Sequence, residues 1–209
     1  KLSEYIKVDN WKPCSAKVHV GNIERLIDHL GGEMLYGSGS DLLGVTIREI
    51  IQNSRDAIFA RSFVEKDFVG KITVKVEKND SDTSLIVEDN GVGMSERVLT
   101  GPLLDFGTSF WTSSLIKSEF PGLRSSGFKS IGKFGIGFYS IFMIADSVCV
   151  ESRNWQDGLS EIHQLKFKEG FTLRPILKKG LIEGFPSSAS TRVKLKLKAS
   201  VLPDDLMIE

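Results

Sequence analysis

"SIGKFGIGFYSIFMIADSVCV", residues 130–150, places three glycines within six residues directly before an apolar segment. Glycine at the start of a helix lets phosphate oxygens approach unpaired backbone amides, and the positive end of the helix dipole favours an anion. The alternative is that Gly132, Gly135 and Gly137 only cap a helix and form a turn. The apolar segment after Gly137 predicts a second long helix, but this stretch alone leaves both interpretations of the glycines open.

The segment "GFKSIGKF", residues 127–134, matches the pattern G-x-x-x-x-G-K of a phosphate-binding P-loop. A P-loop needs a Ser or Thr hydroxyl for magnesium after the lysine, and an apolar strand before the first glycine. Here Phe134 occupies the hydroxyl position, and no apolar strand leads into Gly127. The sequence therefore argues against a P-loop.

Residues 41–67, "DLLGVTIREIIQNSRDAIFARSFVEKD", carry apolar side chains at spacings of three and four, which predicts the principal helix. At about 100° per residue, Glu49, Asn53 and Asp56 share one narrow face of this helix. Glu49 could orient or deprotonate a water while the side-chain oxygen of Asn53 binds magnesium, a hard cation that prefers oxygen ligands. The alternative is a solvated polar stripe on an amphipathic helix.

The segment "IVEDNGVGMS", residues 86–95, ends an apolar strand at Asp89 and continues with two glycines. Gly91 and Gly93 permit backbone conformations and close contacts that other residues block. Asp89 could then accept a hydrogen bond from the amino group of a base, and Met94 could pack on an aromatic ring. Taken alone, "DNG" is a common turn.

The rest of the chain is typical of helices mixed with short alternating strands. Residues 71–78 and 83–90 flank the turn-forming "NDSD" and predict an antiparallel hairpin. Further helices are expected at residues 22–32 and 95–104, and further strands at residues 147–153, 162–168, 171–177 and 191–198. These elements predict a single α+β domain over residues 1–209, a two-layer sandwich of helices over a mixed, mostly antiparallel sheet.

Residues 106–131 are rich in Ser, Thr and Gly and show no clear period. A loop of this length inside a compact domain is unusual unless it is functional or mobile. The residues of this stretch leave a functional loop and a mobile loop both open.

Composition limits the classes of partner. The 27 Lys and Arg residues balance 27 Asp and Glu residues, so no overall charge attracts nucleic acid or an anionic membrane. The longest apolar run, about a dozen residues, is too short to span a bilayer. Cys14 and Cys149 have neither the number nor the spacing of a disulfide framework or a zinc site. We expect a cytoplasmic protein without a membrane partner, and we disfavour nucleic acid as a partner of this domain.

The order of these motifs is more specific than any one of them. The principal helix carries E-x-x-x-N-x-x-D, D-x-G-x-G begins 36 residues after its Asn, and G-x-x-G-x-G-F follows the long unpatterned stretch. This order, over residues 42–197, resembles the ATP-binding domain of the GHKL superfamily, which has the Bergerat fold and includes gyrase, MutL, histidine kinases and the 90-kilodalton heat-shock chaperone. "REIIQNSRDAI", "EDNGVGMS", "IGKFGIGFYSIFMIADSVCVESR" and "STRVKLKL" are most similar to the chaperone branch.

The resemblance implies ATP as the ligand and Mg2+ as the cofactor. Glu49 would be the general base that activates the attacking water, Asn53 would be the protein ligand of magnesium, and Asp56 would pair structurally near the pocket. The residues implied to wrap the phosphates form the base of a lid over residues 106–131: Gly132, Lys133, Gly135, Ile136, Gly137 and Phe138. Lys133 could equally be a solvated residue.

At the other end of the implied site, Asp89 would bind the adenine amino group. Thr191 would assist it through a water, and Gly93 and Met94 would line the adenine pocket.

The resemblance further implies an ATPase whose lid closure is coupled to conformational change or to remodelling of a protein client. We expect a longer protein, with a homodimer partner bound through regions beyond residue 209. The isolated domain would hydrolyse ATP slowly, because the lid and a following domain must close over the phosphate to exclude bulk water.

Other functions within the same resemblance are the ATP-binding domain of a histidine kinase, a mismatch-repair or topoisomerase-like ATPase, and a module that binds nucleotide without turnover. Glu49, which is suited to act on water, disfavours the kinase. The neutral charge and the lack of a basic stripe disfavour an ATPase that acts on DNA.

Overall fold

The structure, a computed structural model, describes residues 42–79, 81–105, 107–123, 125–132, 137–168 and 174–202. The helix expected at residues 22–32 lies outside these ranges, as do the candidate phosphate residues Lys133, Gly135 and Ile136. The described α-helices are α3 (Leu42–Val64), α4 (Glu96–Thr100), α5 (Ile116–Glu119) and α6 (Ile141–Ile144), with short 3₁₀ turns η2 (Pro102–Leu104), η3 (Phe110–Thr112), η4 (Gly137–Ser140), η5 (Leu159–Glu161) and η6 (Ala199–Val201).

Six strands form one sheet in the order β1-β2-β6-β3-β4-β5. They are β1 (Ile72–Lys78), β2 (Thr83–Asp89), β3 (Ala145–Ser152), β4 (His163–Lys168), β5 (Ile176–Lys179) and β6 (Thr191–Leu197). The predicted hairpin is confirmed, because β1 pairs with β2 from Ile72↔Asp89 to Lys78↔Thr83. All neighbouring strands described in this sheet pair antiparallel, so the parallel component that we expected is not found among them.

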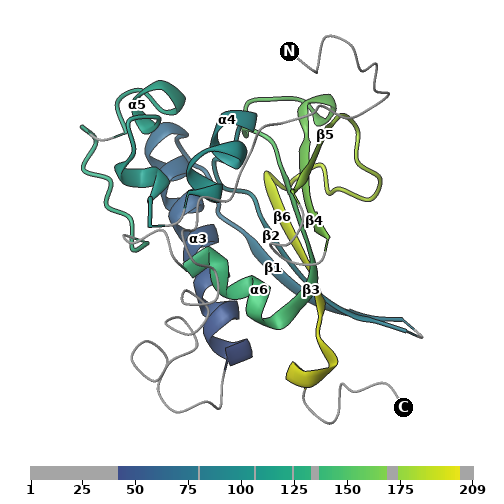
Figure 1. The fold of residues 1–209 in the computed structure, drawn as a ribbon. Helices are drawn as coiled ribbons and strands as arrows, with labels where there is room; N and C mark the ends of the chain where they lie inside the picture. Colours follow the sequence, from purple (N-terminus) through teal and green to yellow (C-terminus); the bar gives the residue numbers. More distant parts are fainter. Residues whose placement is uncertain are drawn as a thin grey trace, which may run out of the picture.

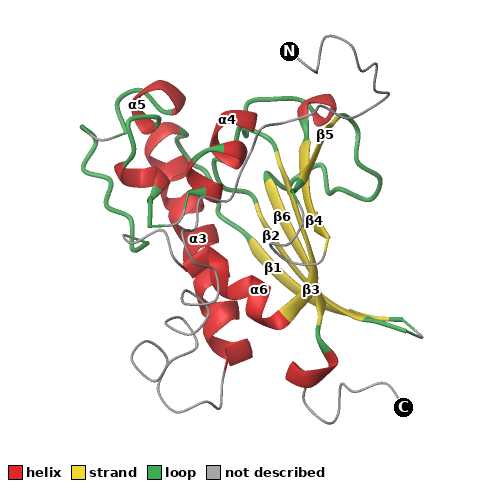
Figure 2. Cartoon of the chain, in the orientation of Figure 1, coloured by secondary structure: helices red, strands yellow, loops and turns green. Residues whose placement is uncertain are grey.

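The helices lie over one face of this sheet, so the molecule has two layers (Figures 1 and 2). The principal helix is confirmed as α3, whose buried residues include Val45, Ile50 and Ala60. The predicted α+β sandwich is therefore confirmed. None of the described helices has the length and apolar character that crossing a membrane requires.

The core lies between the two layers and follows the period-two alternation of the strands. In β6, Leu195 is fully buried while its neighbour Lys196 is exposed. Leu195 pairs with Leu85 of β2 and with Val148 of β3, so apolar side chains form a row across the central strands.

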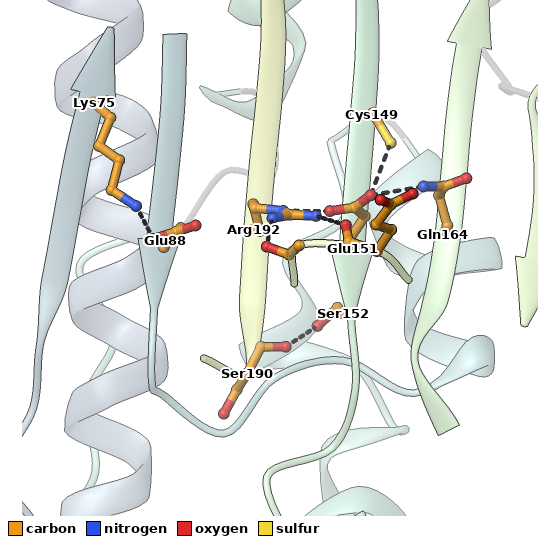
Figure 3. Close-up of polar contacts among 10 residues, drawn as sticks. Lys75, Glu88, Cys149, Glu151, Ser152, Gln164, Ser190 and Arg192 are labelled. Carbon is orange, nitrogen blue, oxygen red and sulfur yellow. Dashed lines mark hydrogen bonds and ion pairs between the residues drawn. The ribbon is translucent and has the colours of Figure 1, made fainter. Parts of the chain in front are cut away.

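The outer face of the sheet carries a buried polar network (Figure 3). Arg192 of β6 donates to the Glu151 carboxylate of β3, and Gln164 of β4 donates to the same carboxylate at 2.6 Å. The carbonyl of Gly184 accepts from Arg192, and the Phe185 ring centroid lies 5.3 Å from the Arg192 guanidinium carbon. The connection between β5 and β6 therefore covers this end of the sheet and keeps the ion pair out of water.

The prediction of a second long helix after Gly137 is wrong. The chain forms the turn η4 and the single turn α6, and it enters β3 at Ala145. A short apolar run does not distinguish a buried helix from a buried strand by its period. Here tertiary pairing decides between helix and strand. The segment from Ala145 pairs along β6, from Ala145↔Leu197 to Ser152↔Thr191, on the side of β6 that β2 does not occupy.

Candidate active site

A cavity of about 420 Å³ lies between α3 and the inner face of the sheet. Every candidate site residue that the structure describes lines this cavity: Glu49, Asn53, Asp89, Gly93, Met94, Gly132, Gly137, Phe138 and Thr191. The three motifs, which are far apart in the sequence, therefore meet in one place.

Asp89 lies at the floor of the cavity, where β2 ends beside the first residue of β6. Its register partner there is Thr191, and its Oδ1 accepts the amide of Gly91 at 2.9 Å. The Ser54 hydroxyl of α3 donates a further hydrogen bond to the Asp89 carboxyl. Burial outweighs these hydrogen bonds and raises the pKa of Asp89 to about 7. The floor thus offers a buried carboxyl group that gains from an additional hydrogen-bond donor.

The loop after β2, at Gly91 and Gly93, packs closely against α3 and against Arg153, the residue after β3. Gly93 adopts φ +67°, and a Cβ built on it would overlap the carbonyl oxygen of Arg153. A Cβ on Gly91 would contact the backbone of Ala57 in α3, whose carbonyl accepts the Val92 amide at 3.1 Å. Close backbone approach therefore requires glycine at both positions of D-x-G-x-G, and Gly93 is required by its positive φ as well.

Glu49 lines the cavity from α3. Partial burial raises the pKa of Glu49, and the neighbouring Arg48 guanidinium lowers it to a smaller extent. The Cα of Gly137 sits directly against this carboxylate, since a Cβ on Gly137 would overlap Glu49 Oε2. The second glycine motif therefore leaves just enough room for the Glu49 side chain.

Asp56 is fully buried one helical turn after Asn53. Its carboxylate accepts the amides of Ile131 and Gly132, each at 2.9 Å to Oδ2. A Cβ on Gly132 would stand 3.6 Å from the Asn53 side-chain oxygen, so the chain at Gly132 also lies against Asn53. Asp56 therefore has the structural role that we expected. It binds the backbone at the end of the 106–131 segment to α3.

The described part of residues 106–131 contains short helical turns, η3 and α5, that the sequence did not indicate. Thr108, Ser109, Phe110 and Trp111 line the cavity. The Ser109 hydroxyl donates to the Gly132 carbonyl at 3.0 Å. This segment therefore forms one wall of the cavity.

Two serines at this site were missed from the sequence. Ser54 stands four residues after Ile50 and three before Ala57, so it interrupts the apolar stripe of the helix. Ser152 continues the inward positions of Val148 and Val150 in β3, where an apolar residue is the normal choice. A polar side chain at an inward position was the signal that could have identified both.

Among the described residues, no group of three or more His, Cys, Asp and Glu side chains is placed to hold a metal ion. Glu49 and Asn53 of α3 are among the residues that bring side-chain oxygens to the cavity.

The model of the family "Histidine kinase-, DNA gyrase B-, and HSP90-like ATPase" matches residues 42–172 of this chain. The chain is 33% identical over 144 residues to the chaperone protein HtpG of Chlorobaculum tepidum, covering 63% of this chain and 22% of that protein. It is 32% identical over 173 residues to HtpG of Halalkalibacterium halodurans, covering 79% of this chain and 26% of that protein. It is 37% identical over 142 residues to HtpG of Anaplasma marginale, covering 60% of this chain and 22% of that protein. The chain spans about a quarter of the length of the curated relatives that it matches.

Proposed function

Since this chain belongs to the histidine kinase-, DNA gyrase B- and HSP90-like ATPase family, we propose that its cavity binds ATP with magnesium and hydrolyses it to ADP and phosphate. The observation that carries this proposal is that the helix motif, the D-x-G-x-G loop and the second glycine segment all line one cavity. Membership of the family supports adenine nucleotide as the ligand, and the geometry supports a role for each residue.

The adenine base binds at the floor, where Asp89 accepts a hydrogen bond from its amino group. The burial of Asp89 supports this role, because a buried carboxylate gains most from a donor that water no longer supplies. Thr191 lies beside it and assists through a water, while Gly93 and Met94 form the wall against the ring.

Glu49 is the general base. It takes a proton from a water whose oxygen attacks the γ-phosphorus, and the bond from that phosphorus to the bridging oxygen of ADP breaks. The partial burial of Glu49 raises its pKa, which brings its basicity closer to neutral pH and so suits this role. Its contact with Gly137 restricts where the carboxylate can lie.

Magnesium fits the oxygen ligands at this cavity. The ion usually takes one or two protein oxygens and completes its shell with phosphate oxygens and water. Asn53 supplies such an oxygen through its amide carbonyl, one helical turn after Glu49. Bound magnesium supplies charge neutralisation for the phosphates.

Gly132, Gly137 and Phe138, which line the cavity, contact the phosphates. The sequence motif assigns the same role to Lys133, Gly135 and Ile136. Residues 106–131 act as a lid over the nucleotide, anchored at its end by Asp56. Closure of this lid is coupled to conformational change in the whole protein, which acts on a protein client and pairs with a second copy through regions beyond residue 209. The printed name of the relatives, chaperone protein HtpG, supports this assignment over a kinase or a DNA-linked ATPase.

The test is calorimetric titration of ATP with magnesium, together with an assay of phosphate release. Asp89→Asn should weaken ATP binding about 10- to 100-fold, because it removes a charged acceptor from a buried site. Glu49→Gln should keep binding but lower phosphate release by about 10²–10⁴-fold. Glu65→Gln, one residue after the end of α3 and paired with Arg61, is the matched control and should change neither. A parent protein that binds no adenine nucleotide would refute the proposal.

A further inference from the structure

The Ser152 hydroxyl lies directly behind the cavity floor and is fully buried. It accepts the amide of Met94 at 2.9 Å. It donates to the Ser190 carbonyl at 3.1 Å (Figure 3). Its third contact is with the hydroxyl of Thr191, at 2.9 Å between the two oxygens. Ser152 itself does not line the cavity, whereas Met94 and Thr191 do. It therefore acts on the cavity through these two neighbours.

The number of protons available decides the direction of the Ser152–Thr191 hydrogen bond. A serine hydroxyl has one proton to donate and two lone pairs that accept. The Ser190 carbonyl can only accept, so the contact with it uses the Ser152 proton. The Met94 amide occupies one lone pair, and the remaining lone pair faces the Thr191 hydroxyl. All three contacts are satisfied only when Thr191 is the donor to Ser152.

When Thr191 donates its hydroxyl proton to Ser152, away from the cavity, its hydroxyl presents only lone pairs to the cavity. Beside it, Asp89 receives donors from the Gly91 amide and the Ser54 hydroxyl, and in its ionised form it too can only accept from a ligand. The floor is therefore a pair of adjacent acceptors on β2 and β6. A ligand edge, or a water bound there, has to supply the protons.

We infer that Ser152 is a positioning residue for base selection: by accepting the Thr191 proton, it makes the cavity floor favour a purine with an amino group at position six over one with an oxygen there. This inference rests on the proposed nucleotide site. Adenine has a donor at position six and an acceptor at N1, whereas hypoxanthine has an acceptor and a donor at these positions. A bridging water that donates to Thr191 also has its second proton free for N1 of adenine, so direct and water-mediated contacts favour the same base.

The experiment compares the dissociation constants of ATP and inosine triphosphate, measured by calorimetry with magnesium. The ratio of the two constants within one variant is the readout, because a partial loss of folded protein changes both constants by the same factor. The parent should prefer ATP. In Ser152→Ala the Thr191 proton is released and can turn toward an oxygen at position six, so the preference should fall about five- to tenfold, the value of one hydrogen bond.

Two comparisons separate positioning from a general structural effect. In a Thr191→Val background, Ser152→Ala should no longer change the preference, because the hydroxyl through which it acts is gone. Ser190→Ala is the matched control, since the Ser190 hydroxyl is equally buried but has no hydrogen-bond partner among the described residues. It should leave the preference unchanged.

A preference that persists in Ser152→Ala, or that falls equally with and without the Thr191 hydroxyl, would overturn the inference while leaving the ATPase proposal intact. Failure of the parent to bind either nucleotide would refute the proposed function instead. In that case the proton assignment is decided without ligand, by NMR of the Thr191 hydroxyl proton. Slow exchange in the parent and fast exchange in Ser152→Ala would support the assignment, and equal exchange would refute it.

Discussion

The backbone amide of Gly132 donates a 2.9 Å hydrogen bond to the carboxylate of Asp56, 76 positions earlier in the chain. The amide of Ile131 donates to the same buried carboxylate. This contact fixes the end of the 106–131 segment to the turn of α3 that also carries Asn53. The proposed lid therefore has one anchored end, next to the proposed magnesium ligand.

Asp56→Asn should lower the free energy of unfolding by about 1–3 kcal/mol. The new side-chain NH2 replaces one carboxylate oxygen, and it would face either the two backbone amides that Oδ2 accepts or Arg55 Nη1 and the Ile131 amide at Oδ1. In either orientation at least one hydrogen bond to the carboxylate is lost. Urea unfolding measures this loss, and Glu77→Gln on the exposed surface of β1, which should change stability by less than about 0.5 kcal/mol, is the control. Equal stability of Asp56→Asn and the parent would show that the contact contributes nothing.

The stability of the nucleotide-free protein should depend on pH through Asp89. Its pKa is raised from 3.8 to about 7 by burial, so the folded state holds this proton more tightly than the unfolded state. The resulting stability is fully present below pH 3.8 and is lost as the pH rises through about 7. Relative to Asp89→Asn, the free energy of unfolding of the parent should fall by up to about 1.4 kcal/mol per pH unit in this window.

Urea unfolding of both proteins at several pH values between 4 and 8 checks the Asp89 prediction. Taking the difference between parent and variant cancels the titration of all other groups. A difference that does not vary with pH would contradict the assigned direction of the shift.

Gly93→Ala should destabilise the protein more than Gly122→Ala, although both glycines have positive φ. Gly93 has φ +67° and faces the Arg153 carbonyl, whereas Gly122 has φ +85° and open space around a built Cβ. Gly122→Ala should lose about 1–2 kcal/mol from the backbone conformation. Gly93→Ala should lose about 1–3 kcal/mol more from the steric overlap. Thermal and urea unfolding of the pair measure the difference, and equal losses would exclude the overlap as a cause.

Gly137→Ala should displace the Glu49 carboxylate, which a new Cβ would overlap. The half-buried Glu49 side chain can rotate away, so stability should change little, but a displaced base lowers turnover by about 10²-fold. Phosphate release measured at saturating ATP reports this loss. In a Glu49→Gln background, Gly137→Ala should have little further effect. A further loss of the same size would mean that Gly137 acts by another route.

Local patterns predicted the elements whose structure depends on near neighbours. The spacing of Leu43, Ile47, Ile50 and Ile51 was enough for α3, because one helical face determines its own period. The hairpin of β1 and β2 followed from two β-rich runs around a turn. The segment after Gly137 was predicted incorrectly, because its apolar residues suit either a helix or a strand and the choice depends on pairing with β6.

The chemistry of the candidate site could be identified from the chain alone, since Glu49, Asn53, Asp89 and the glycines stand at short, recognisable spacings. The partners that orient these groups required the folded molecule. Asp56 with Gly132, and Ser152 with Thr191, are joined by hydrogen bonds between residues 76 and 39 positions apart. Which residues meet over such distances depends on strand register and on how α3 lies over the sheet, and neither is contained in the local order of side chains.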